Sequence, residues 1–161
     1  NNAYCQDNRI SWLDWSRLEE YKEIHDFFCY MIAFRKKYTI LRRPTKSLAC
    51  GLPDISIHNG YPWNGGSDNG TRLIGIMYAG RDEADTRDDI VFYCMNAYWE
   101  PLDMQLPSLP DGMHWKICVN TSVVYEDGKD IQAMTDFRFG SKLKVPPRAV
   151  VILVGEPRLR T

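Results

Sequence analysis

The sequence lacks the features that mark several large classes of protein. It has no basic block, since 20 lysines and arginines are balanced by 21 aspartates and glutamates, for a formal net charge of -1. Binding to nucleic acid depends on rows of positive charge facing the phosphates, so we expect no nucleic-acid partner. No apolar run approaches the roughly 18 residues that a membrane span needs. The longest runs from Ala149 to Val154, so we expect no membrane partner either.

Metal and redox motifs are also missing. The five cysteines are widely and irregularly spaced and form no C-x-x-C pair, which indicates neither a zinc site nor a redox motif. His25 lies on a predicted helix without a second histidine four residues later, so the helical zinc-binding pattern is excluded. No serine has a nucleophile-elbow context. We expect no cofactor, no metal, and reduced thiols in a cytoplasmic protein.

Candidate carboxylates for acid–base chemistry are few. The densest acidic stretch, residues 82–89, holds five carboxylates among charged and small neighbours. Nothing apolar in it would raise a pKa, which favours a solvated turn over a self-contained active site. Glu100 follows Tyr98 and Trp99, and the pattern favours a strand-end acid beside a packing aromatic over a catalytic acid.

The sequence does contain one long helical pattern. Ser16 and Glu19 match the S-x-x-E capping box, which predicts a helix that begins there and continues to about Tyr38. From Phe27 to Phe34 nearly every position is apolar, more than the single stripe of a surface helix. Such a helix is expected to lie between two bodies. The 161 residues of the chain supply only one of them.

Beyond Pro53 the apolar period changes from 3.6 to 2, which predicts strands. Turn signals separate them and no helical pattern intervenes, so we expect a mainly β fold, an antiparallel β-sandwich. The last apolar run is hydrophobic on both faces and should be a central strand. The predicted strands are Ile55–His58, Arg72–Tyr78, Ile90–Ala97, Leu102–Leu106, Trp115–Val119, Leu143–Val145 and Ala149–Val154.

The opening stretch NNAYCQDNRISWLDW resembles the segment after the eighth barrel strand in glycogen debranching enzymes and isoamylases, pullulanase-like members of the α-amylase superfamily of glycoside hydrolases. FFCYMIAFRKKYTILRR is similar to the end of that family's final barrel helix. DIVFYCMNAYWEPLDMQLPSLPDGMHWKICVNTS and VPPRAVVILVG resemble strands of its C-terminal domain. One departure is Arg9, where the family usually carries an acidic residue.

The resemblance implies two parts. Residues 1–50 would be the last loop and last helix of a (β/α)8 catalytic barrel, and residues 51–161 a C-terminal β-sandwich domain. The family hydrolyses α-1,6 linkages with a nucleophilic Asp, an acid/base Glu and a supporting Asp, on strands that precede Asn1. We therefore expect a non-catalytic, stabilising C-terminal part of a debranching enzyme. Its partners would be the upstream barrel of the same polypeptide and, through the parent enzyme, an α-glucan such as glycogen or limit dextrin.

The resemblance also places the first residues at the barrel face that carries active sites. Asn2, Tyr4, Asp7 and Asn8 are therefore the candidate substrate-binding residues, because they offer amide, hydroxyl and carboxylate groups to sugar hydroxyls. A structural alternative stays open, in which these side chains brace neighbouring loops through hydrogen bonds.

The alternative function is a carbohydrate-binding module for α-glucans. Its stacking platforms would be Tyr61, Trp63, Tyr98 and Trp99, since sugars stack on exposed aromatic rings. For Tyr61 and Trp63, the plainer interpretation is that both rings pin an ordered loop.

Overall fold

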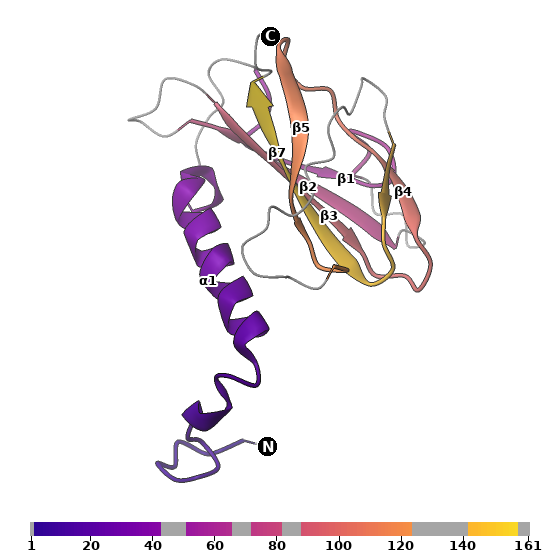
Figure 1. Cartoon of the computed structure of the whole chain (residues 1–161). Helices are drawn as coiled ribbons and strands as arrows, with labels where there is room; N and C mark the ends of the chain where they lie inside the picture. Colours follow the sequence, from indigo (N-terminus) through magenta and orange to yellow (C-terminus); the bar gives the residue numbers. More distant parts are fainter. Residues whose placement is uncertain (1, 43–50, 66–71, 82–87, 124–141, 158–161) are drawn as a thin grey trace.

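The chain folds into one long helix and a mainly β body (Figure 1). The computed structural model describes residues 2–42, 51–65, 72–81, 88–123 and 142–157. No helix in these ranges is long and apolar enough to cross a membrane. The elements are α1 (Lys22–Lys37), with a 3-10 turn on either side (Trp15–Arg17 and Thr39–Leu41), and strands β1 (Ile55–His58), β2 (Leu73–Gly80), β3 (Asp89–Asn96), β4 (Leu102–Gln105), β5 (Met113–Asn120), β6 (Lys142–Val145) and β7 (Ala149–Pro157).

The strands form antiparallel pairs throughout. Five of them make one sheet in the order β1-β2-β3-β7-β5, and β4 pairs with β6. β2 and β3 pair along their whole length, from Leu73 opposite Asn96 to Gly80 opposite Asp89. β7 lies between β3 and β5, which confirms that the run apolar on both faces is a central strand. All seven predicted strands are present, with ends that differ by a few residues.

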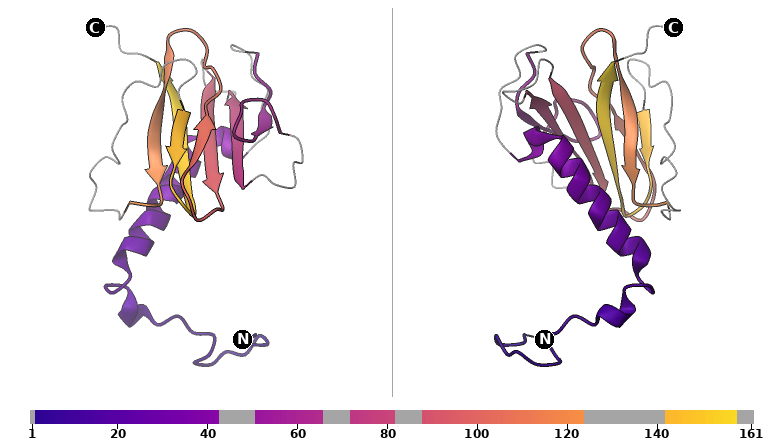
Figure 2. Two further views of the ribbon diagram at one scale, coloured as in Figure 1. Left: turned by 90° about the vertical axis from the view of Figure 1, so that its right-hand side faces the viewer. Right: turned by 60° about the vertical axis from the view of Figure 1, so that its left-hand side comes forward.

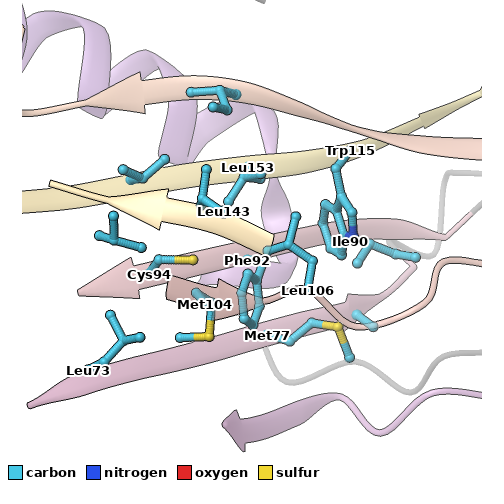
Figure 3. Close-up of a cluster of buried hydrophobic side chains, with 14 residues drawn as sticks. Leu73, Met77, Ile90, Phe92, Cys94, Met104, Leu106, Trp115, Leu143 and Leu153 are labelled. Carbon is cyan, nitrogen blue, oxygen red and sulfur yellow. The ribbon is translucent and has the colours of Figure 1, made fainter. Parts of the chain in front are cut away.

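The main core lies between the five-stranded sheet and the β4–β6 pair (Figure 3). Alternate side chains of each strand point into it, because the strand period is two. Phe92 is fully buried, and its ring centroid lies 5.8 Å from that of Trp115 and 5.2 Å from that of His58. The indole N–H of Trp115 donates to the carbonyl of Pro107 at 2.9 Å, which satisfies the polar group that this side chain buries.

Helix α1 packs on the opposite face of the sheet (Figure 2). Phe34 and Tyr38 are buried against a second apolar cluster. The hydroxyl of Tyr30 donates to the carbonyl of Cys118 at 3.1 Å, which fixes the middle of the helix over β5. α1 and β7 run in the same general direction (Figures 1 and 2). The N-terminal end of α1 therefore lies at the end of the sheet where β7 begins.

The predicted start of the helix is wrong. The Asp14 carboxylate accepts both the backbone N–H and the hydroxyl of Ser16, at 3.1 and 2.5 Å. The Ser16 side chain is therefore engaged with Asp14 and does not cap the helix. Asp14 instead caps the 3-10 turn Trp15–Arg17. The regular helix begins at Lys22, after Tyr21, whose side chain makes no capping hydrogen bond.

The expectation that α1 lies between two bodies is met on one side only. Phe28 and Ile32 of α1 are 62% and 54% exposed. Trp12 and Trp15 are also exposed, although two tryptophans so close in sequence are expected to pack. The segment before the helix extends away from the sheet (Figure 2). A large part of the apolar surface of the chain is thus uncovered.

Candidate functional site

The four predicted substrate-binding residues lie in a loop that mainly bonds to itself. The backbone N–H of Tyr4 donates to Asn2 Oδ1 at 2.8 Å, and that of Ile10 donates to Asn8 Oδ1 at 3.0 Å. The indole N–H of Trp12 donates to Asp7 Oδ1 at 2.5 Å. These contacts set the shape of the loop and leave the Tyr4 ring exposed. Asn2, Tyr4, Asp7 and Asn8 thus lie in one loop, in which Asn2, Asp7 and Asn8 accept local hydrogen bonds and the Tyr4 ring is exposed.

The loop after β1 is organised by a buried histidine. His58 is 1% exposed, and its Nδ1 accepts the backbone N–H of Trp63 at 2.8 Å. Its Nε2 lies 2.8 Å from the Ser56 hydroxyl, so the proton of the neutral ring is assigned to Nε2. Burial lowers the pKa of His58. The Tyr61 and Trp63 rings are about half or more exposed, and the contacts of Trp63 match the interpretation of a pinned loop.

The connection between β3 and β4 carries the second aromatic pair. The ring centroids of Tyr98 and Trp99 are 4.0 Å apart, with planes inclined at 36°. The Arg72 guanidinium lies 4.1 Å from the Tyr98 ring centroid and 5.6 Å from that of Trp99. Asn96, 3% exposed, bonds to the backbone of this connection. Arg72 was not predicted, because only the β2–β3 register brings it beside residues 98 and 99.

The acidic candidates do not form a pair of catalytic carboxylates in the described part of the chain. Asp88 is buried and its Oδ1 lies 3.1 Å from Nε of Arg81, an ion pair that ties the start of β3 to the end of β2. Residues 82–87 of the predicted acidic turn lie outside the described residues. Glu100 is exposed, and its backbone carbonyl accepts from Asn96 Nδ2, as fits a strand-end position.

The described residues contain no cluster of three or more His, Cys, Asp or Glu side chains able to hold a metal ion. Cys5, Cys29, Cys94 and Cys118 are free thiols, and burial raises the pKa of the Cys94 thiol. Cys50 lies outside the described residues.

Several large apolar side chains are exposed on the helix side of the sheet. Residues of β1 pair with β2 so that Ile57 lies opposite Ile76 and Ile55 opposite Tyr78. Tyr78 packs in the cluster under the helix, so these β1 side chains point to the same side as α1. We call the following set the apolar face: Ile24, Phe28 and Ile32 of α1 with Ile55, Ile57 and Ile74 of the sheet, all between 44% and 62% exposed.

A pocket of about 300 Å³ adjoins the apolar face, between α1 and β2–β3. Burial, together with the neighbouring Tyr78, raises the pKa of Tyr93 to about 12, so its hydroxyl is neutral at physiological pH. The pocket is thus lined mainly by apolar and neutral groups with one cation, Arg35. Its lining residues are Phe28, Met31, Ile32, Phe34, Arg35, Leu41, Tyr78 and Tyr93.

The known proteins that are similar to this chain have names that refer to glycogen or to isoamylase. A glycogen operon protein GlgX homolog of Mycobacterium tuberculosis is 25% identical over 95% of this chain. The glycogen debranching enzyme of Escherichia fergusonii is 44% identical over 43 residues, 27% of the chain. The isoamylase of Pseudomonas amyloderamosa is 25% identical over 71% of the chain. The chain is similar to a part of debranching enzymes.

The match covers only a small part of each relative. The chain spans 23% of the length of the Mycobacterium relative, 15% of the isoamylase and 6% of the Escherichia enzyme. No family model matches the chain.

Proposed function

We propose that this chain is the C-terminal, non-catalytic part of an α-glucan debranching glycoside hydrolase of the α-amylase superfamily. The parent enzyme would hydrolyse α-1,6 linkages with carboxylates that precede Asn1. Residues 1–50 would complete its (β/α)8 barrel, and residues 51–161 would form a closing β-sandwich from the five-stranded sheet and the β4–β6 pair. The similarity to three proteins with glycogen or isoamylase names supports this proposal, as does the share of their length that the chain spans.

The apolar face is the observation that supports a stabilising role for this chain in the parent enzyme. A monomer rarely leaves a contiguous set of large apolar side chains exposed, because their contact with water is unfavourable. Here exposed apolar side chains of α1, β1 and β2 lie on the same side of the sheet, and Phe28 and Ile32 line the pocket. The proposed occupant of the apolar face is the upstream barrel of the same polypeptide. Its docking would cover both α1 and the first two strands, and would stabilise both parts in a cytoplasmic enzyme.

The N-terminal loop would then supply glucan contacts at the barrel face. The exposed Tyr4 ring offers a stacking surface, while Asp7 holds Trp12 and keeps the loop in shape. In the complete enzyme, Tyr4→Ala should weaken turnover of a branched glucan, and Asp7→Ala should do so through the loop. Arg9→Ala, at an exposed neighbouring position, is the matched control. Unchanged kinetics for both variants, with intact folding, would contradict this role.

Co-expression with the upstream coding region tests the proposal as a whole. We expect the 161-residue chain alone to release no reducing sugar from glycogen. We expect it to copurify with the upstream part as a complex that cleaves α-1,6 linkages. Phe28→Asp, which puts a charge into the apolar face, should weaken that complex about tenfold or more. Reducing sugar released by the chain alone, or an upstream region that encodes no barrel, would refute the proposal.

A further inference from the structure

The connection between β3 and β4 is held rigidly although it is exposed. The Asn96 side chain bonds to it at both ends, with Nδ2 donating to the Glu100 carbonyl at 2.9 Å and Oδ1 accepting the Tyr98 N–H at 2.9 Å. The Tyr98 carbonyl accepts the backbone N–H of Arg148 at 2.9 Å. The backbone of this connection is therefore held at both ends, which lowers the cost of ordering it when a ligand binds.

Trp99 is presented to solvent on this rigid support. Its side chain is 63% exposed, while the Tyr98 ring backs it at 4.0 Å between centroids and Arg72 lies above Tyr98. Here the neighbouring ring and the guanidinium orient the indole but leave most of it open.

We propose that Trp99, Tyr98 and Arg72 form a binding platform for an α-glucan, separate from the catalytic cleft. The apolar C–H face of a glucose ring would stack on the Trp99 indole, and the N–H donors of Arg72 would bond to hydroxyl oxygens of the same or the next sugar. The choice of α-glucan as the ligand rests on the proposed function.

The orientation of α1 places the platform on the side where substrate is held. β7 begins opposite Asn96, and the N-terminal end of α1 lies at that same end of the sheet (Figure 1). In a (β/α)8 barrel each helix starts at the face that carries the active site. If α1 is the last barrel helix, the platform and the catalytic face point in the same direction. The platform would then hold an outer branch of a large glucan while another part of it occupies the cleft.

Affinity electrophoresis in gels that contain glycogen tests the platform directly. The 161-residue chain should be retarded relative to its migration in a plain gel. Trp99→Ala should lower the affinity about tenfold or more, and Arg72→Ala should lower it less. Trp15→Ala removes a tryptophan elsewhere that is 72% exposed, slightly more than Trp99, and should leave retardation unchanged. Because the Trp99 ring is mostly solvated, Trp99→Ala should unfold within about 0.5 kcal/mol of the unsubstituted chain.

The outcomes separate this inference from the proposed function. No retardation of the chain, or equal retardation of Trp99→Ala, would overturn the platform. If the chain nevertheless copurified with an active barrel, the proposed function would stand without it. A third outcome is that Trp99→Ala abolishes retardation, Trp15→Ala does not, and the upstream region encodes no barrel. That result would support the platform and overturn the debranching-enzyme assignment. The chain would then be a carbohydrate-binding module.

Discussion

Replacing Asn96 should test how the β3–β4 connection is held. The side chain is 3% exposed. Its Nδ2 donates to the carbonyls of Glu100, Val145 and Pro146 at 2.9, 3.2 and 3.0 Å, and its Oδ1 accepts the N–H of Tyr98 at 2.9 Å. One amide thus joins β3, the start of the next connection and the end of β6. Asn96→Ala removes all of these bonds and leaves backbone groups without partners.

The expected cost is about 3 kcal/mol of unfolding free energy. The amide has two N–H donors, which three carbonyls share, and one oxygen acceptor, so the equivalent of three hydrogen bonds is lost at about 1 kcal/mol each. With a urea m-value of about 2 kcal/mol/M, the midpoint of unfolding should fall by about 1.5 M. Asn120→Ala is the matched control. The Asn120 oxygen accepts the Ser122 N–H at 3.1 Å in an exposed turn, and its removal should cost less than about 1 kcal/mol.

Asn96→Asp gives the sharper test, because it keeps the shape of the side chain and replaces the Nδ2 donor with an oxygen. At neutral pH its carboxylate would face three carbonyl oxygens, so this variant should be at least as unstable as Asn96→Ala. Protonation at low pH restores one O–H donor and should bring back part of the lost stability. If Asn96→Asp unfolded within about 1 kcal/mol of the unsubstituted chain at neutral pH, the amide donors would not hold this connection.

Two further changes test the loop after β1 and the core. Burial lowers the pKa of His58 below its ordinary 6.5, so stability should fall as the pH drops through 6.5 toward the folded-state pKa. His58→Asn, which can still accept from the Trp63 N–H, should flatten this dependence in urea titrations at several pH values; an unchanged slope would contradict it. Gly75→Ala would place a methyl 2.6 Å from Phe92 Cζ and should cost about 2 kcal/mol. Gly60→Ala, with 3.6 Å to the nearest atom, should be neutral, and equal melting temperatures for the two would refute the packing argument.

The strands could be predicted because their burial follows the sequence period closely. β2, β5 and β6 alternate between buried and less buried positions along most of their length, and β7 is buried on both faces as its composition indicates. The first residue of the helix was harder to predict. Asp14 and Ser16 each have a side chain that can cap a helix. The sequence alone does not tell which of the two accepts a backbone N–H of the first turn. The structure shows Asp14 taking both groups of Ser16, which delays the regular helix to Lys22.

The candidate sites could be predicted only in part, because they depend on contacts between distant residues. The aromatic pair Tyr98 and Trp99 is visible in the sequence, but the guanidinium of Arg72 reaches it through strand pairing. Likewise, Ile55 and Ile57 alternate with polar neighbours as in any edge strand. Their pairing with β2 shows that they face the helix side. The breadth of apolar positions in α1, by contrast, correctly indicated an uncovered face.

The position of the platform leads to a prediction about substrate size in the complete enzyme. Arg72 lies directly before β2, and its carbonyl accepts the Ala97 N–H at 2.9 Å, which extends the β2–β3 pairing by one residue. Arg72 precedes Ile74 by two residues, so the alternation of that pairing puts it on the side of the apolar face. A glucan on the platform would therefore border the docked barrel. Trp99→Ala should raise KM for glycogen several-fold with kcat unchanged, because it removes binding outside the cleft. A short branched oligosaccharide cannot reach both places, so its kcat/KM should stay the same. An equal loss on both substrates would mean that Trp99 acts through the fold or the cleft, and not as a separate binding surface.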